Sequence, residues 1–167
     1  GVANMEQEKE KNEETFVKKV VQTALEAERQ IRRQQVLHNT RMLMEEYIEM
    51  KRHIESAVSE EEELKEEQYD VFRGEGAHLG SVRRSKMKTA MMIANIDRAM
   101  EELRAEYETK EMTYKYDAFK MHYIDGASYE EIADIQNCGK NTPSRWSKEL
   151  IRKMSVKLFG IDGVEKY

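Results

Sequence analysis

The residues best suited to a chemical task lie between Lys140 and Lys157. This segment carries six Lys or Arg residues and one acid, Glu149. At 100° per residue, its polar and basic side chains fall on one side of a helix, and Trp146 and the aliphatic residues after it fall on the other. Such a helix can enter the DNA major groove, where side chains reach base edges and cations neutralise phosphates. We expect base contacts from Asn141, Ser144 and Arg145, and phosphate contacts from Lys140, Lys148 and Arg152.

Other patterns give little support for catalysis. The glycines from Gly74 to Gly80 lack the spacing of a dinucleotide-binding loop, so we interpret this stretch as a hinge. The four histidines are scattered without an i, i+4 pair, which argues against a metal site. No nucleophile is grouped with a base. The sequence therefore predicts a protein that is not an enzyme and needs no cofactor or metal.

The helix that precedes the basic segment is recognised by its aromatic residues. Tyr116, Phe119 and Tyr123 share one face of a helix predicted from Tyr114 to Ile124, and Asp125-Gly126 ends it. Ser128 and Glu131 have the spacing of a capping box, so a second helix should begin at Tyr129. Its inward residues are expected to be Ile132, Ala133 and Ile135.

A turn of three to four residues should separate this second helix from the basic one. Gly139 suits a left-handed or capping position there. Pro143 suits a helical first turn, so the basic helix is expected to begin within residues 139–143. Trp146 and Leu150 should anchor it in a core, and Cys138 is interpreted as a packing residue.

The preceding hundred residues must position this unit, and they read as helices. A helical stripe of apolar residues runs from Glu13 to about Gln68, with a break expected near Asn39 because His38-Asn39-Thr40 supplies capping types. A second stripe, rich in Met, runs from Ser81 to about Glu108 and is interpreted as core. Together they predict a helical hairpin or coiled coil, folded back within one chain or shared between two. We hypothesise that this arm dimerises.

Composition agrees with an all-α protein. Of 167 residues, 37% are charged, 8 are Gly and 1 is Pro, and the mean hydropathy is -0.86. The net charge of -5 is uneven: residues 113–167 hold 9 basic and 8 acidic residues, whereas residues 1–112 hold 19 and 25. One cysteine excludes an intrachain disulfide, and no apolar run approaches the roughly 20 residues of a membrane span. We expect a reduced, cytoplasmic protein without a signal peptide or membrane association.

Two resemblances to known protein families narrow the expected function. The string FKMHYIDGASYEEIADIQNC looks like the region-four helix-turn-helix of bacterial sigma factors. Together with NTRMLMEEYIEMKRHIESAV, the run from Asn141 to Trp146 and a later KLFG, it resembles the phage ArpU-like and RinA-like late transcriptional regulators. This resemblance implies a phage or prophage activator of late genes in a bacterial host, acting at promoter DNA with RNA polymerase. It places Asn141, Thr142, Ser144, Arg145 and Lys148 on the reading helix, although Pro143 and Gly139-Lys140 depart from the sigma-factor pattern.

The expected organisation has four parts. Residues 1–12 are a disordered N-terminus that opens with residues typical of cloning, 13–112 are the helical arm with a loop at 73–80, 113–160 are a small sigma-factor-like helix-turn-helix domain, and 161–167 are a flexible tail. The leading hypothesis is a sequence-specific, double-stranded DNA-binding transcriptional regulator that forms a homodimer through its helical arm. The alternatives are a DNA-packaging adaptor resembling a phage small terminase subunit, and a polymerase-binding protein that never contacts DNA.

Overall fold

The computed structural model describes the backbone of residues 1–67 and 76–160, and the side chains of residues 1–56 and 85–160. Within these ranges the chain forms helices and no strand, which confirms the predicted all-α class. The helices are α1 (Val2–Glu67), α2 (Gly76–Thr109), α3 (Thr113–Tyr123), α4 (Tyr129–Ile135) and α5 (Thr142–Phe159). No helix in the described ranges has the length and apolar character that crossing a membrane requires.

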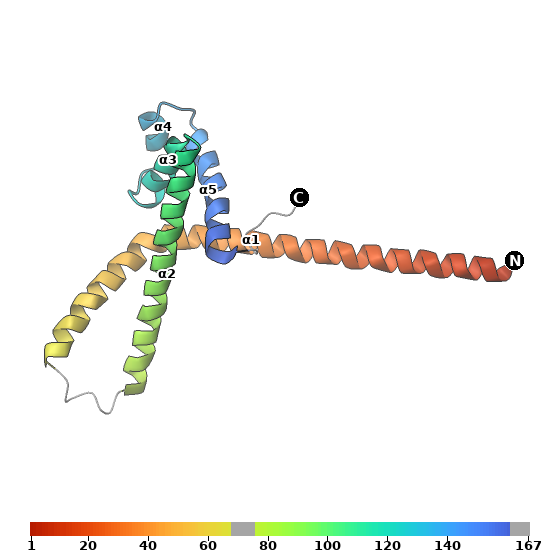
Figure 1. The fold of residues 1–167 in the computed structure, drawn as a ribbon, viewed down its shortest axis with the longest axis horizontal. Coiled ribbons are helices and arrows are strands. Elements are labelled where there is room, and N and C mark those ends of the chain that lie inside the picture. The colour runs from red at the N-terminus through yellow and green to blue at the C-terminus, as the bar shows by residue number, and fades with distance from the viewer. Residues whose placement is uncertain (68–75, 161–167) are drawn as a thin grey trace.

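The first helix, α1, is continuous, and this corrects the break expected near Asn39. The reason is visible at Thr40, which is fully buried and donates its hydroxyl to the Val36 carbonyl at 2.8 Å. A threonine bonded back to the preceding turn continues a helix instead of capping a new one. Figure 1 shows α1 running straight from the N-terminus and then curving toward the end of the hairpin.

The two arm helices begin earlier in the chain than the predicted starts at Glu13 and Ser81. Helix α1 begins at Val2, so residues expected to be disordered before Glu13 are helical. Helix α2 begins at Gly76, so Gly76 and Gly80 lie within a helix and not in the expected loop, while Gly74 lies outside the described residues. The predicted tail at 161–167 also lies outside them.

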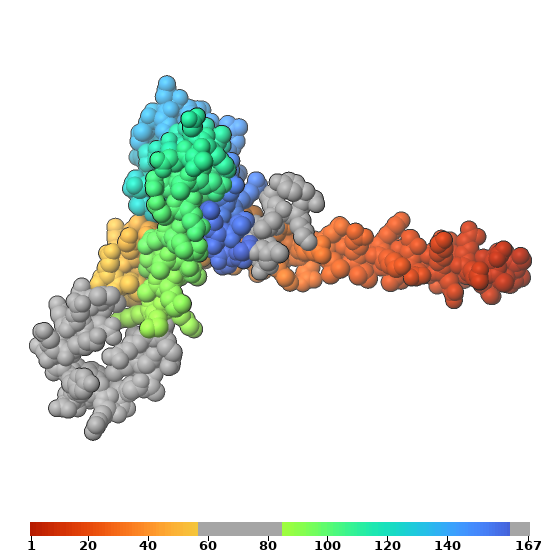
Figure 2. Space-filling view, viewed as in Figure 1, coloured from red at the N-terminus to blue at the C-terminus, as the bar shows by residue number. Residues whose placement is uncertain are grey.

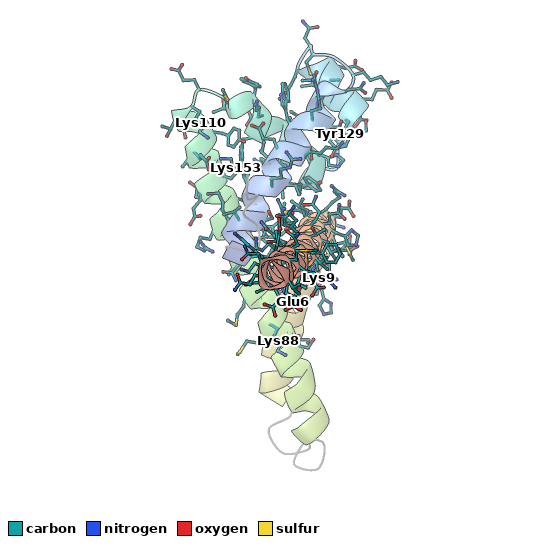
Figure 3. All side chains as sticks on the ribbon, turned by 90° about the vertical axis from the view of Figure 1, so that its right-hand side faces the viewer. Glu6, Lys9, Lys88, Lys110, Tyr129 and Lys153 are labelled. Carbon is teal, nitrogen blue, oxygen red and sulfur yellow. The ribbon has the colours of Figure 1, made fainter. Side chains whose placement is uncertain are left out.

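The helices form three projections from one crossing point. The N-terminal part of α1 extends alone, the hairpin of α1 and α2 points another way, and α3, α4 and α5 gather at the far end of α2 (Figures 1 and 2). We call residues 113–160 the head. Viewed along α1, the head lies on one side of that helix and the hairpin on the other (Figure 3).

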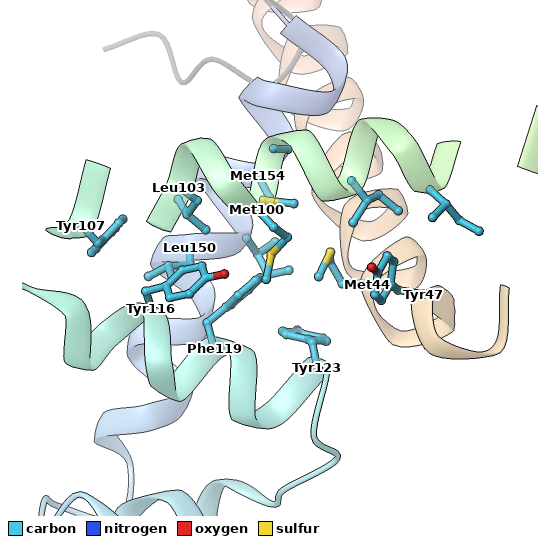
Figure 4. Packing of buried hydrophobic residues seen from close by; sticks show 14 residues of the cluster. Met44, Tyr47, Met100, Leu103, Tyr107, Tyr116, Phe119, Tyr123, Leu150 and Met154 are labelled. Carbon is cyan, nitrogen blue, oxygen red and sulfur yellow. The ribbon is translucent and has the colours of Figure 1, made fainter. Parts of the chain in front are cut away.

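One buried cluster joins the hairpin to the head. Met44 and Tyr47 of α1 and Met100 and Leu103 of α2 belong to the same cluster as residues of α3 and α5 (Figure 4). The head residues of that cluster are Tyr116, Phe119, Tyr123, Leu150, Ile151 and Met154. The boundary expected at residue 113 therefore falls inside a shared core.

The methionine stripe of α2 is only partly buried. Ile96, Met100 and Leu103 lie in the core, but Met87 and Met91 are 66% and 63% exposed, so the prediction that they are core residues was wrong. Both residues lie in the first half of α2, before the part of this helix that packs against the head.

A polar contact also joins the two helices of the hairpin, because the Tyr47 hydroxyl of α1 donates to the Asp97 carboxylate of α2.

Candidate nucleic-acid interface

Helix α3 gives the head its aromatic base. Tyr116, Phe119 and Tyr123 are buried, which confirms the face predicted for them. Helix α3 ends at Tyr123, and Gly126 then adopts φ +75°, a conformation that side chains with a Cβ rarely take. The chain can therefore reverse at once toward α4.

Helix α4 begins as predicted. The Ser128 hydroxyl accepts from the Glu131 amide at 3.2 Å, and the Glu131 carboxylate accepts from the Ser128 amide at 2.9 Å, which completes the capping box. Ile132 and Ala133 are buried, but Ile135 is 68% exposed, so its inward assignment was wrong. At 100° per residue, Ile135 lies about 110° from the midpoint of the two buried residues and misses the core.

The turn between α4 and α5 covers residues 136–141 and is longer than expected. Its left-handed residue is Asn137, with φ 51°, and not Gly139. Asn tolerates this conformation because its short polar side chain can bond locally. At Gly139, a Cβ would lie 3.2 Å from the Thr142 hydroxyl oxygen, so a larger residue there would require the Thr142 side chain to shift.

Helix α5 starts at Thr142, within the predicted range, and Pro143 lies in its first turn. Leu150, Ile151 and Met154 are buried on its inner side, as predicted. Trp146 is only half-buried, and its ring meets Tyr114 edge-on with centroids 5.2 Å apart. It anchors α5 against α3 at the margin of the core and not within it.

The outer side of α5 carries an exposed line of four polar and basic residues. Asn141, Arg145, Lys148 and Arg152 are spaced by four, three and four positions, and all four are exposed. We call these four residues the basic ridge. Lys140 is exposed just before it, whereas Thr142 and Ser144 are half-buried beside it.

Short hydrogen bonds organise the start of the ridge. Arg145 donates to the Thr142 hydroxyl at 3.3 Å, and the Ser144 hydroxyl donates to the Asn141 carbonyl at 3.2 Å. The Thr142 hydroxyl thus orients Arg145, a positioning role that the sequence did not predict. No acid lies in the first turn of α5, so the positive end of the helix dipole is not neutralised there.

The cations on the other flank of α5 are already paired with α2. Lys153 lies 2.9 Å from Glu106, and Lys157 lies 3.5 Å from Glu106 and 3.7 Å from Glu102. Figure 3 shows Lys153 and Lys110 on this side. Burial would raise the pKa of Glu106, but hydrogen bonds from Lys153 and Lys110 outweigh it and lower that pKa to about 2.

Lys140, Arg145 and Lys148 differ in this respect. Within the described part of the chain, Lys140, Arg145 and Lys148 have no acidic partner closer than 4.0 Å. The cations on the inner flank of helix α5 therefore tie this helix to α2, whereas the outer ridge presents positive charge to solvent. An arrangement of this kind attracts a polyanion.

A pocket of about 310 Å³, which was not predicted from the sequence, adjoins the ridge. Arg41 of α1 lies on its wall, together with Ser144 and Lys148 of α5. The remaining lining residues are Glu45, His122, Tyr123, Tyr129, Ser147 and Ile151. Arg41 thus extends the basic surface from α5 onto a helix a hundred residues earlier in the chain.

Aromatic residues stiffen the floor of this pocket. The His122 ring stacks on Tyr129 with centroids 4.0 Å apart, and the Tyr129 hydroxyl donates to Ser147 at 2.9 Å, which ties α4 to α5. Burial raises the pKa of Tyr123 to about 12, so its hydroxyl stays protonated at neutral pH. The pocket wall thus combines two cations, Arg41 and Lys148, with hydroxyl groups and one carboxylate, Glu45.

No group of three His, Cys, Asp or Glu side chains in the described residues is arranged to hold a metal ion. No protein-family model, curated protein or solved structure matches the chain.

Proposed function

We propose that this chain is a sequence-specific, double-stranded DNA-binding transcriptional regulator that reads its target with the first half of α5. The observation that carries the proposal is the basic ridge, which stands exposed on a helix whose opposite side is locked into the core. A reading helix needs this division, because the core holds the orientation while the exposed side meets the groove.

Each ridge residue has a distinct role in the proposal. Asn141 and Arg145 stand at the start of α5, where side chains of a reading helix reach base edges, and Arg145 can make a bidentate contact with guanine. Lys148, Arg152 and Lys140 contact phosphates, and Arg41 adds a further cation beside Lys148. Thr142 and Ser144, half-buried, shape the first turn and flank the contact.

The resemblance to the phage ArpU-like and RinA-like late regulators supports the proposed biological setting. In this setting the protein is a phage or prophage regulator of late genes in the cytoplasm of a bacterium, acting alongside RNA polymerase without catalysis. A small terminase-like adaptor remains the rival, and a ring of many subunits in sedimentation would favour it.

Two substitutions on the ridge test DNA reading. Arg145→Ala should reduce discrimination between target and random duplex by roughly 1 to 3 kcal/mol, because a base contact is lost. Lys148→Ala should weaken both duplexes alike and reduce the slope of log K against log salt by about 1. Fluorescence anisotropy on a duplex selected from a random pool measures both effects.

Lys19→Ala, on the exposed N-terminal part of α1, is the matched control and should leave affinity unchanged. If selection enriches no motif and the ridge variants bind duplex as well as this control does, the proposed function is wrong. Binding that is strong but blind to sequence would favour the packaging rival.

A further inference from the structure

The N-terminal part of α1 has no partner for its apolar side among the residues that the structure describes. Every residue from 2 to 32 is exposed, and we call this segment the free arm. Phe16 is 68% exposed, Val17 58% and Ile31 65%. At 100° per residue, Val17, Val20, Ala24 and Ile31 fall within about 60° of one another, so they form one stripe. A lone helix rarely keeps such a stripe in water.

The stripe faces away from the head. Thr40, Met44 and Tyr47 pack into the molecule, and they project on the opposite side of α1 from the stripe. Met42, which is 48% exposed, continues the stripe past the crossing point. A second helix can therefore run along the stripe beyond the free arm without covering the residues of α1 that pack into the molecule.

Charge along α1 selects the direction of that second helix. Residues 6–14 hold five Glu and two Lys, whereas residues 29–41 hold four Arg and no acid. In a parallel pair each segment would face its own copy, acid against acid and arginine against arginine. In an antiparallel pair centred near Ala24, residues 6–14 of one chain face residues 34–42 of the other, a stretch that holds Arg41 and no acid.

The ion pairs within α1 do not prevent its charged side chains from pairing with a second chain. Glu14 contacts Lys18 at 2.9 Å and Glu28 contacts Arg32 at 3.2 Å, both within α1 and both well exposed. Exposed pairs of this type contribute little and reorganise readily. Near the acidic end of the arm, Met5, Phe16 and Val17 are also exposed, at 73%, 68% and 58%.

We infer that two copies of this chain associate through their free arms as an antiparallel helix pair centred near Ala24. The occupant of the apolar stripe is thus a second copy of the same segment, running in the opposite direction. The inference deepens the proposed function, since it names how the dimeric regulator is built, but the pairing itself requires no DNA.

Cysteine cross-linking tests both the pairing and its direction, in full-length chains that carry Cys138→Ser. Thr23→Cys lies near the centre and should cross-link to itself with a short bismaleimide. Lys9→Cys should not, because its two copies would lie about 43 Å apart at 1.5 Å per residue. Mixing Lys9→Cys with His38→Cys should give a cross-linked heterodimer, since these positions face one another.

Self-linking of Lys9→Cys without a mixed product would overturn the antiparallel arrangement. A monomer at tens of micromolar in sedimentation, with Thr23→Cys unlinked, would overturn pairing altogether. Val20→Glu places a charge in the stripe and should weaken association about tenfold or more, whereas Gln22→Glu on the opposite side is the matched control. Among the residues that the structure describes, the free arm is exposed along its whole length, so neither variant should unfold the head.

These experiments contain no DNA. A negative result would therefore leave the DNA-reading proposal standing, and failure of the ridge variants to affect DNA binding would leave the pairing standing.

Discussion

At the scale of single residues, Ser128 shows how one side chain sets the start of an element. Its hydroxyl and the Glu131 carboxylate satisfy two amides that the first turn of α4 would otherwise leave without acceptors. Helix α4 has seven residues, so it has little intrinsic stability and depends on this cap.

Ser128→Ala should therefore destabilise the protein by about 1 kcal/mol. Urea unfolding followed by circular dichroism gives the value. Ser128→Asp retains an acceptor at the cap and should stay within a few tenths of a kcal/mol of the parent. Equal losses in the two variants would contradict a capping role.

Residue types predicted this part of the chain well where the pattern is local. The capping box and the aromatic face of α3 depend on neighbours a few positions apart, and both were confirmed. Gly139 and Ile135 were misassigned for a physical reason. Asn and Gly both tolerate φ above zero, and only the packing of the turn places Asn137 there; a helix as short as α4 has too few residues to define its inward side.

At the scale of elements, the predicted break in α1 was wrong because Thr40 can play either of two structural roles. Threonine can cap a helix or bond back to the carbonyl four residues earlier, and sequence does not distinguish these. Burial of Thr40 against the rest of the molecule favours the second. The choice is made by tertiary contacts, which a local pattern does not contain.

The contact between α2 and α5 leads to a pH dependence. The folded pKa of Glu106 is about 2, below the usual 4.5, so its contribution to stability is complete above about pH 5 and is lost as the pH falls toward 2. Glu106→Gln removes this contribution. Its stability should lie about 1 to 2 kcal/mol below the parent at pH 7, allowing for partial exposure.

The gap between parent and Glu106→Gln should close as the pH is lowered from 5 to 2, and chemical denaturation at each pH measures it. Glu108→Gln, at an exposed pair with Arg104, is the comparison. A gap that stays constant over this range would show that Glu106 does not titrate as the contact requires.

At the scale of the whole molecule, the shared core makes the head depend on the hairpin. Leu103 of α2 is fully buried in the cluster that contains Phe119 and Leu150 of the head. Leu103→Ala should cost roughly 2 to 5 kcal/mol. Because the hairpin and the head share this cluster, they should unfold together. Tryptophan fluorescence from the head and circular dichroism dominated by α1 and α2 should therefore report the same unfolding midpoint. Two separated midpoints would contradict a single shared core.

The candidate site was predictable only on the helix that carries it. The ridge follows from helical spacing between Asn141 and Arg152, and its exposure agrees. Arg41 and the pocket beside Lys148 were not predictable, because they arise when α1 crosses α5. Likewise, Lys153 and Lys157 look equivalent to the ridge cations until Glu102 and Glu106 of α2 are placed beside them.

The unbroken course of α1 has a consequence for the target. Because α1 is continuous between the free arm and the head, an antiparallel pair would fix the distance between the two heads. The two Arg41 residues would lie about 50 Å apart at 1.5 Å per residue. Neighbouring half-sites one helical turn apart are separated by about 34–36 Å. An operator occupied by both heads at once should therefore carry inverted repeats spaced by more than one turn of the double helix.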